Sequence, residues 1–342
     1  MTIDEILNLA IKKNSSDIHL AIHKRPVFRM DGQLVEQEEF AVFEDVELKN
    51  TILEPLSDYQ KKELEAEREL AFVYSLPDHH RFRVNVFWDQ GRLALAARAI
   101  PSTVPTMEQV GLPKVAYDFL NLDKGLIILT GQTGNGKSTS LAAMIDHVNK
   151  TRAAHIITFE DPIEFVFKSE SSIVRQREYG ADFTSFEKSL KFVVRHDPNV
   201  IMVGEMRDPE TIATTITLAE TGHLVLTTLH TFDAAQTIYR IIDYFPSDQQ
   251  DQIRLQLALT LRGIISQLLL PKVGGGRIPA REILVNTPAI ANLIRENKIE
   301  HIPSILQTGQ DHGMTTMDQA LQDLLGKKLI TDDTARAHMT RT

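Results

Sequence analysis

The chain has 342 residues, of which 42% are hydrophobic and 24% are charged, and it contains no cysteine. This length suggests two domains, and the composition is typical of a soluble globular protein. Without cysteine the chain can form neither disulfides nor thiolate metal sites, and a net charge of −9 argues against a general nucleic-acid binder. The N-terminus resembles no secretion signal, and no apolar run approaches the roughly 20 residues of a membrane helix. We therefore expect a cytoplasmic protein with no integral membrane segment.

The first hundred residues predict a small α+β domain. Thr2 and Glu5 have the spacing of a helix capping box, and apolar residues at i, i+3 and i+4 spacing indicate that the chain opens with an amphipathic helix. Asp31-Gly32 is typical of a tight turn between strands. The other elements expected here are strands at 17–20, 27–30, 34–35, 81–88 and 93–100, and a charged helix at 58–70.

Polar and apolar residues alternate along one strand of this domain. Arg81, Arg83 and Asn85 are separated by Phe82 and Val84, so the polar side chains share one face. A half-solvated antiparallel sheet explains this pattern, and the sequence alone favours that explanation. The alternative is that the arginines reach a nucleotide on a neighbouring subunit, as arginine fingers.

The next stretch of chain contains Pro101, Pro105 and Pro113. These prolines predict an interdomain linker, because proline stiffens the backbone and prevents regular ladders. From Tyr117 onward, buried apolar strands alternate with helical patterns, which indicates a mostly parallel sheet with crossover helices. The expected organisation is an N-terminal domain at 1–100, a linker at 101–113, an α/β domain at 114–286 and a C-terminal helical region at 287–342.

The segment from Gly131 to Ser138 fits the phosphate-loop pattern G-x-x-x-x-G-K-[ST]. An apolar strand at 126–129 enters it and a helical pattern at 140–145 leaves it, which is the context of a functional loop. Backbone N–H groups and the helix N-terminus bind a polyphosphate, Lys137 neutralises it and Ser138 offers an oxygen to Mg²⁺. The pattern therefore predicts a nucleotide-hydrolysing enzyme.

A glycine-rich turn with a solvent-facing lysine would explain an isolated match, but the strand and helix around this loop argue against it. Without nucleotide we expect Lys137 to be a surface cation. The loop residues expected to bind nucleotide are Gly131, Thr133, Gly134, Asn135, Gly136, Lys137, Ser138 and Thr139.

Two acidic clusters follow apolar runs, at strand ends where open parallel sheets bind ligands. Glu160, Asp161 and Glu164 come after the first run, and their carboxylates suit orientation of the attacking water or of the metal's water shell. For each acid alone, a solvated loop start is an equally good explanation. The second run ends in Glu205 and Arg207 and is Walker-B-like.

The second cluster departs from the usual Walker B pattern. Gly204 occupies the place where many such proteins carry a metal-holding aspartate. Glu205 must therefore supply the carboxylate near Mg²⁺. Arg207 and Asp161 are further candidates for contacting the nucleotide.

His223 and His230 flank one apolar strand. A shared zinc ion is excluded, because residues seven apart on an extended strand are about 23 Å apart. We interpret both as hydrogen-bonding sensors near a phosphate or at a subunit boundary. A structural role is the usual explanation for a lone histidine, and only the neighbouring clusters favour function here.

Four segments in order, GQTGNGKS, ITFEDPIEF, VIMVGEMRD and AETGHLVLTTLH, resemble the Walker A, aspartate-box, Walker B and histidine-box motifs of secretion and pilus motor ATPases. The resemblance is strongest to the PilT-type ATPases of type IV pilus retraction and covers essentially the whole chain. It implies that Glu164 is the catalytic base and Glu205 the Walker B acid. It also implies that His223 and His230 are the histidine-box pair. The RFRVN segment looks like the family's arginine-bearing strand, which makes Arg81, Arg83 and Arg98 candidates for contacting a nucleotide across a subunit interface.

The resemblance further implies a PAS-like N-terminal domain, a RecA-like core, ATP and Mg²⁺ as cofactors, and a homohexameric ring. The ring would dock on an inner-membrane platform protein at the inner face of the cytoplasmic membrane, with a paralogous pilus ATPase as a further partner. Extension and type II secretion motors usually have a longer N-terminus and a four-cysteine zinc site, so this chain resembles the retraction branch.

The residues from Ala289 to Glu296 resemble the family's AIRNLIRE motif, but Ala291 replaces its first arginine. Thr287 and Pro288 predict a helix N-cap and first turn, so we expect a helix there with Asn292, Arg295 and Glu296 facing outward. The departure at Ala291 keeps a PilU-like accessory ATPase as an alternative. Two further alternatives are a ring that binds ATP mainly for assembly and a nucleic-acid translocase, which the acidic charge disfavours.

Overall fold

The computed structural model describes residues 1–30, 32–78, 80–100 and 103–339. It divides the chain into two compact units, Met1–Thr103 and Val104–Thr342, and each is described by itself. The boundary falls within the stretch predicted as a linker, whose first residue, Pro101, lies outside the described residues. Asp31, the first residue of the predicted tight turn, also lies outside them.

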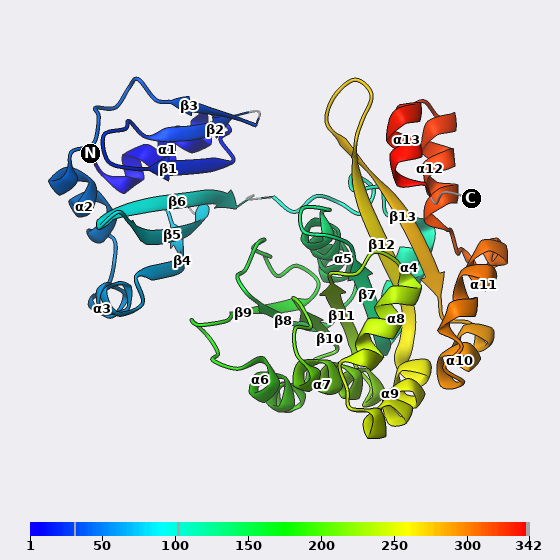
Figure 1. The fold of residues 1–342 in the computed structure, drawn as a ribbon. Coiled ribbons are helices and arrows are strands. Elements are labelled where there is room, and N and C mark those ends of the chain that lie inside the picture. The colour runs from blue at the N-terminus through cyan, green and yellow to red at the C-terminus, as the bar shows by residue number, and fades with distance from the viewer. Residues whose placement is uncertain (31, 79, 101–102, 340–342) are drawn as a thin grey trace. The chain divides into compact units, whose positions relative to one another are not determined.

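The first unit is an antiparallel sheet with helices, in the strand order β3-β2-β1-β6-β5-β4 (Figure 1). Its apolar core gathers residues from α1, α2 and α3 and from the inward face of the sheet. The helices are α1 (Ile3–Lys12), α2 (Asp45–Leu53) and α3 (Asp58–Glu67), and the strands are β1 (Asp17–Leu20), β2 (Val27–Met30), β3 (Gln33–Glu36), β4 (Glu69–Ser75), β5 (Arg81–Asp89) and β6 (Arg92–Ile100).

The predicted capping box is confirmed, since the Thr2 hydroxyl accepts from the Glu5 backbone and the Glu5 carboxylate accepts from the Thr2 backbone. The predicted end of the charged helix, at residue 70, is wrong. Arg68 has a left-handed φ of 63°, which stops α3, and the chain turns at once into β4, where Leu70 is buried. Helix α2 and strand β4 are absent from the sequence-based expectation.

The second unit is built on a sheet with the order β13-β12-β7-β11-β10-β8-β9, in which every neighbouring pair is parallel except β12 and β13. This agrees with the predicted mostly parallel sheet. The strands are β7 (Gly125–Thr130), β8 (His155–Glu160), β9 (Ile173–Glu178), β10 (Val200–Val203), β11 (Leu224–Leu229), β12 (Leu261–Pro271) and β13 (Arg277–Val285). The helices are α4 (Lys114–Leu120), α5 (Lys137–Thr151), α6 (Phe186–Val193), α7 (Pro209–Glu220), α8 (Ala234–Asp243), α9 (Ser247–Thr260), α10 (Pro288–Arg295), α11 (Ile302–Thr308), α12 (Met317–Gly326) and α13 (Asp332–His338).

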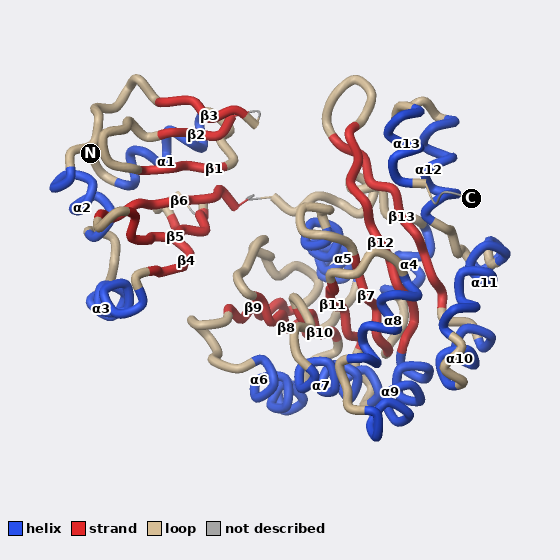
Figure 2. Tube along the Cα trace, in the orientation of Figure 1, coloured by secondary structure: helices blue, strands red, loops and turns tan. Residues whose placement is uncertain are grey.

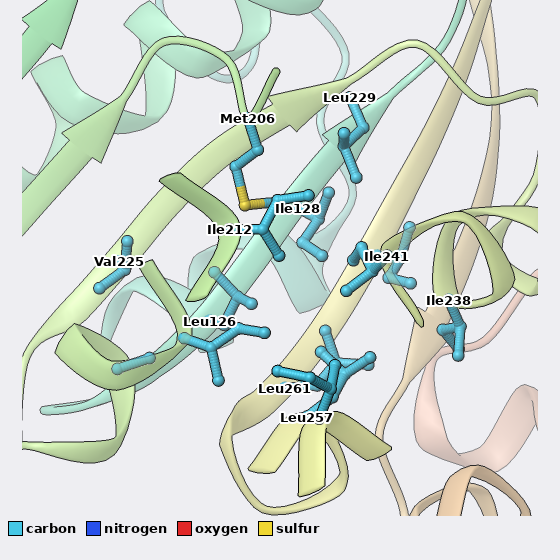
Figure 3. Packing of buried hydrophobic residues seen from close by; sticks show 14 of the residues in the cluster. Leu126, Ile128, Met206, Ile212, Val225, Leu229, Ile238, Ile241, Leu257 and Leu261 are labelled. Carbon is cyan, nitrogen blue, oxygen red and sulfur yellow. The ribbon is translucent and has the colours of Figure 1, made fainter. Parts of the chain in front are cut away.

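Both faces of this sheet are covered, as expected for a parallel sheet with crossovers. Leu126 and Ile128 of β7 face one side, where Figure 3 shows them packed with residues of α7, α8 and α9. Ile127 and Leu129 face the other side, against α4 and α5. Successive side chains of β7 thus point to opposite faces of the sheet and belong to two separate apolar cores.

The C-terminal residues pack onto the same unit. Helix α10 begins at the predicted cap, where the Thr287 hydroxyl accepts from the Ile290 backbone. It buries Ile290 and Ile294 in the same core as Leu126 and Ile128. Glu296 is the C-cap and not a helical residue. Figure 2 shows α12 and α13 beside the long β12–β13 hairpin, with which they share a small apolar cluster.

The strand order of the sheet determines where the candidate site residues lie. The parallel strands β7, β11, β10 and β8 are consecutive neighbours, so their carboxyl ends meet at one edge of the sheet. The phosphate loop follows β7, His230 follows β11, Glu205 follows β10 and Glu160 ends β8. Motifs up to about one hundred residues apart in the chain are thereby brought to one place.

Candidate active site

The phosphate loop has a backbone that requires glycine. Gly131 has a φ of +145°, and a Cβ there would lie 2.3 Å from the Gln267 carbonyl oxygen. Gly136 has a φ of +75° and is the N-cap of α5. Within the described part of the chain no side chain caps α5, so the N–H groups of its first turn are open to a phosphate. These features fit a bound nucleotide polyphosphate.

Lys137 is not the surface cation that the sequence predicts. It is only 8% exposed, and its ammonium donates to the carbonyl oxygens of Gly131 at 2.7 Å and Gln132 at 3.1 Å. Burial lowers the pKa of Lys137, while the nearby carboxylates of Glu205 and Glu164 oppose this shift. Lysine therefore stabilises the loop itself, and a phosphate would have to replace these carbonyl contacts.

A chain of polar contacts leads from Lys137 across the site. Its Nζ lies 3.2 Å from His230 Nδ1, and His230 Nε2 lies 3.2 Å from Glu205 Oε1. Arg207 donates to the other Glu205 oxygen at 3.0 Å and to Asp161 at 2.8 Å. The structure thus joins the phosphate loop, the histidine box, the Walker B segment and the aspartate box in one line of side chains.

The glycine in the Walker B segment has a steric reason. The N–H of Gly204 donates to the Phe159 carbonyl at 2.8 Å, and the Gly204 carbonyl accepts from the Thr228 hydroxyl at 2.6 Å. A Cβ at Gly204 would lie 3.2 Å from the Phe159 oxygen, tighter than ordinary contact. The close approach of β10 to β8 disfavours an aspartate here, and the acidic group comes from the next residue, Glu205.

Glu160 is turned into the protein. It is 6% exposed, and its carboxylate accepts from the Thr158 hydroxyl at 2.7 Å, from the Gln176 amide at 3.0 Å and from the Glu164 backbone. Burial raises the pKa of Glu160 to about 7. In this structure Glu160 holds the loop that presents the exposed Glu164, instead of offering its carboxylate to the attacking water or to the metal's water shell as its sequence position suggests.

His223 is not brought to the phosphate loop of its own chain. It precedes β11 whereas His230 follows it, so the strand separates them by its whole length. His223 Nδ1 lies 2.9 Å from the Leu218 carbonyl. A role at a subunit boundary stays a prediction.

The three candidate arginines of the first unit, Arg81, Arg83 and Arg98, belong to the outer face of its sheet. Arg83 and Arg98 are register partners on β5 and β6, and Arg98 donates to Asp17 at 2.7 Å. Phe82 and Val84 are buried between the polar positions, as the half-solvated sheet predicts. Contact between Arg81, Arg83 or Arg98 and a nucleotide on another subunit stays a prediction.

Among the described residues, no group of three or more His, Asp or Glu side chains is arranged to hold a metal ion alone. Ser138 and Glu205 offer one hydroxyl and one carboxylate. Mg²⁺ usually takes one or two protein ligands and completes its shell with phosphate oxygens and water, so this donor set fits a nucleotide-bound Mg²⁺.

A cavity of about 490 Å³ adjoins the polar chain. Glu205, Arg207 and Asp161 line one part of it, and Tyr179 and Phe186 line another. Among the candidate residues, Glu205, Arg207 and Asp161 therefore border open space.

Sequence reasoning missed Gln267 and Arg281, which lie directly behind the phosphate loop. Gln267 interrupts the apolar strand β12, and a buried polar residue in such a run is the signal that could have revealed it. Arg281 has no comparable local signal.

The fold and the site define a P-loop nucleotide hydrolase with a mostly parallel core sheet. The chain belongs to the type II/IV secretion system protein family, whose profile matches residues 1–275. ATP hydrolysis is the activity of this class. Among the described residues, no helix is long and apolar enough to cross a membrane.

Relatives share nearly the whole chain. The type IV pilus retraction ATPase PilT of Pseudomonas aeruginosa is 44% identical over 336 residues, covering 98% of this chain and 97% of PilT. The type IV pilus ATPase PilU of the same organism is 37% identical over 339 residues, covering 99% of this chain and 88% of PilU. A crystal structure of the pilus retraction motor PilT with bound ADP superposes with a TM-score of 0.94 at 44% identity, covering 100% of this chain and 98% of that one.

Proposed function

We propose that this chain is a motor ATPase that assembles as a homohexamer and uses ATP hydrolysis to retract type IV pili. The observation that carries the proposal is the line of contacts from Lys137 through His230 to Glu205, in a chain similar to PilT over nearly its full length. A position at the inner face of the cytoplasmic membrane, on a platform protein of the pilus machinery, is part of the same proposal.

In this proposal bound ATP and Mg²⁺ supply the phosphoryl group and the charge compensation that its transfer requires. Lys137 leaves the loop carbonyls and neutralises the phosphates, and the N–H groups at the start of α5 orient them. Ser138 and Glu205 would hold the metal. Glu164, exposed and close enough to act on the charge of Lys137, orients the attacking water.

A PilU-like accessory role is the second candidate, and Ala291 favours it. In this chain Ala291 is 9% exposed and packs against the core under α10. The arginine of the family motif would place a charge at this mostly covered position. The chain thus lacks the first of the two arginines that the family motif places on this helix, and keeps the second as Arg295.

The test begins with ATPase assays on the purified full-length chain. Glu164→Gln should bind ATP and hydrolyse it at no more than about one hundredth of the wild-type rate, because the water loses its orienting acceptor. Glu170→Gln is the matched control, an exposed glutamate farther along the same loop, and should keep wild-type turnover. Normal hydrolysis by Glu164→Gln would assign the role to another residue.

Gene deletion then separates the two candidate roles in the cell. A retraction motor predicts hyperpiliated cells without twitching motility, whereas an accessory ATPase predicts little change. Unpiliated cells would contradict both and indicate an extension motor.

A further inference from the structure

Arg281 of β13 is a buried cation whose partners are almost all neutral oxygens. It is 7% exposed, and among the described residues no carboxylate pairs with it. Its guanidinium donates to the carbonyl oxygens of Gly111 at 2.6 Å and Val110 at 2.7 Å, and to Gln267 Oε1 at 2.8 Å. Burial lowers the pKa of Arg281 to about 10. A buried charge is costly, so this set of acceptors requires an explanation.

Gln267 connects Arg281 to the phosphate loop. Its Oε1 accepts from Arg281 Nε and from the Ser140 hydroxyl, both at 2.8 Å. Because Arg281 has only donors, the amide must present its oxygen to Arg281, which leaves Nε2 to donate to the Asn135 carbonyl. The Leu269 backbone donates to Asn135 Oδ1 at 3.2 Å, so β12 holds this loop residue at two points.

The orientation of the Asn135 carbonyl decides where the next N–H points. In a planar trans peptide the C=O and N–H groups point in opposite directions. With the Asn135 carbonyl held by Gln267, the Gly136 N–H points away from β12. That is the direction required of a donor to a phosphate in the loop.

The other end of the contact chain is the turn at 106–112, near the start of the second unit. Thr106 and Gln109 cap each other, and Met107 and Leu112 are buried in the core against α5. Gly111 has a left-handed φ of +66°, and a Cβ there would lie 3.7 Å from Arg281. Arg281 therefore connects this turn, through Gln267, to the phosphate loop.

We propose that Arg281 and Gln267 are positioning residues for nucleotide binding, which hold the Asn135–Gly136 peptide in its phosphate-binding orientation and couple it to the 106–112 turn. This inference rests on the proposed binding of ATP at the loop. It extends the site to β12, β13 and the segment that follows the boundary between the two units.

The test measures affinity for a fluorescent ADP analogue in the full-length protein, with KM and kcat for ATP and thermal unfolding alongside. Arg281→Met keeps the length of the side chain and removes its donors. Gln267→Glu keeps an acceptor for Arg281 but cannot donate to Asn135. Arg152→Met is the matched control, because Arg152 also donates to two backbone carbonyls, those of Leu120 and Leu122, but at the opposite end of α5 from the loop.

Loss of one such hydrogen bond to the loop should weaken ADP binding about tenfold and raise KM for ATP by a similar factor. This change is expected in Arg281→Met and Gln267→Glu, with kcat altered much less, and not in Arg152→Met. Wild-type affinity in both loop variants would overturn the proposal, as would an equal loss in Arg152→Met. If Arg281→Met fails to fold, Gln267→Glu decides by itself.

Coupling to the turn has a separate measurement. ADP binding to the wild-type protein should slow hydrogen exchange in residues 106–112, because coupling between two sites is reciprocal. Gln267→Glu should abolish that protection at saturating ADP, and protection that survives would refute the coupling. A wild-type chain that binds no ADP would instead contradict the proposed function, so the two failures are distinguishable.

Discussion

Ionisation of Glu160 should destabilise the protein as the pH rises. Burial raises the pKa of this carboxyl to about 7 from an ordinary value of 4.5, and hydrogen bonds from Thr158, Gln176 and the Glu164 backbone only partly oppose the shift. Between these two pH values the folded protein keeps a proton that the unfolded chain releases. Stability therefore falls as the pH rises through this window and is constant above it, as far as Glu160 is concerned.

The size of the effect follows from the two pKa values. The difference between 4.5 and about 7 corresponds to about 3 kcal/mol of unfolding free energy. From pH 5 to pH 8 the change in unfolding free energy is smaller, about 2–3 kcal/mol, because part of the titration lies below pH 5. Glu160→Gln keeps the shape and an acceptor oxygen but cannot ionise, so it should lack this loss.

Urea unfolding of the wild-type protein and Glu160→Gln at constant ionic strength, at four pH values from 5 to 8, measures the difference. The Gln variant should gain about 2–3 kcal/mol relative to wild type across this range. Glu282→Gln provides an independent case, because burial also raises the pKa of Glu282 to about 7. Parallel pH dependences for the wild type and Glu160→Gln would refute the reasoning.

Three other changes address the loop, the subunit interface and the C-terminal helix. Lys137→Ala should reduce ATP turnover below a few per cent and lower the unfolding free energy of the nucleotide-free protein by about 1–3 kcal/mol, because two contacts to loop carbonyls are lost. Unchanged denaturant stability would contradict the structural part of that claim. If Arg83 acts across a subunit interface, mixing Arg83→Ala and Lys137→Ala subunits should restore some ATPase activity, and no recovery in hexamers shown to exchange subunits would argue against a shared site. Leu293 is half-buried, so Leu293→Ala should cost less than the about 2–5 kcal/mol of a fully buried leucine, while pilus retraction falls and ATPase activity persists. Wild-type twitching, or a parallel loss of ATPase activity, would mean that α10 is not a coupling element.

Several features could be predicted from the sequence because short-range contacts define them. The capping box of α1, the cap of α10 and the phosphate loop each depend on residues within about eight positions of one another. Strand alternation also marked Phe82 and Val84 as core residues. Helix α3 was predicted too long because the left-handed residue that ends it, Arg68, has no distinctive sequence signal.

The alignment of motifs at one sheet edge could be expected from a parallel sheet, but the contacts between them could not. Lys137 contacts carbonyl oxygens of its own loop and also His230, which lies 93 residues further along the chain, and no pattern near the loop encodes the second contact. His223 and His230 look like a pair in the sequence, and the length of β11 separates them.

The sequence by itself determined that this protein binds a nucleotide phosphate, since the loop, its strand and its helix are contiguous. Only the tertiary structure revealed what supports that loop. Gln267 and Arg281 lie more than one hundred residues from Asn135 in the chain. Gln267 contacts Asn135 because β12 pairs with β7, and Arg281 contacts Gln267 because β13 pairs with β12. No local pattern encodes such a contact, because its formation depends on how the whole sheet assembles.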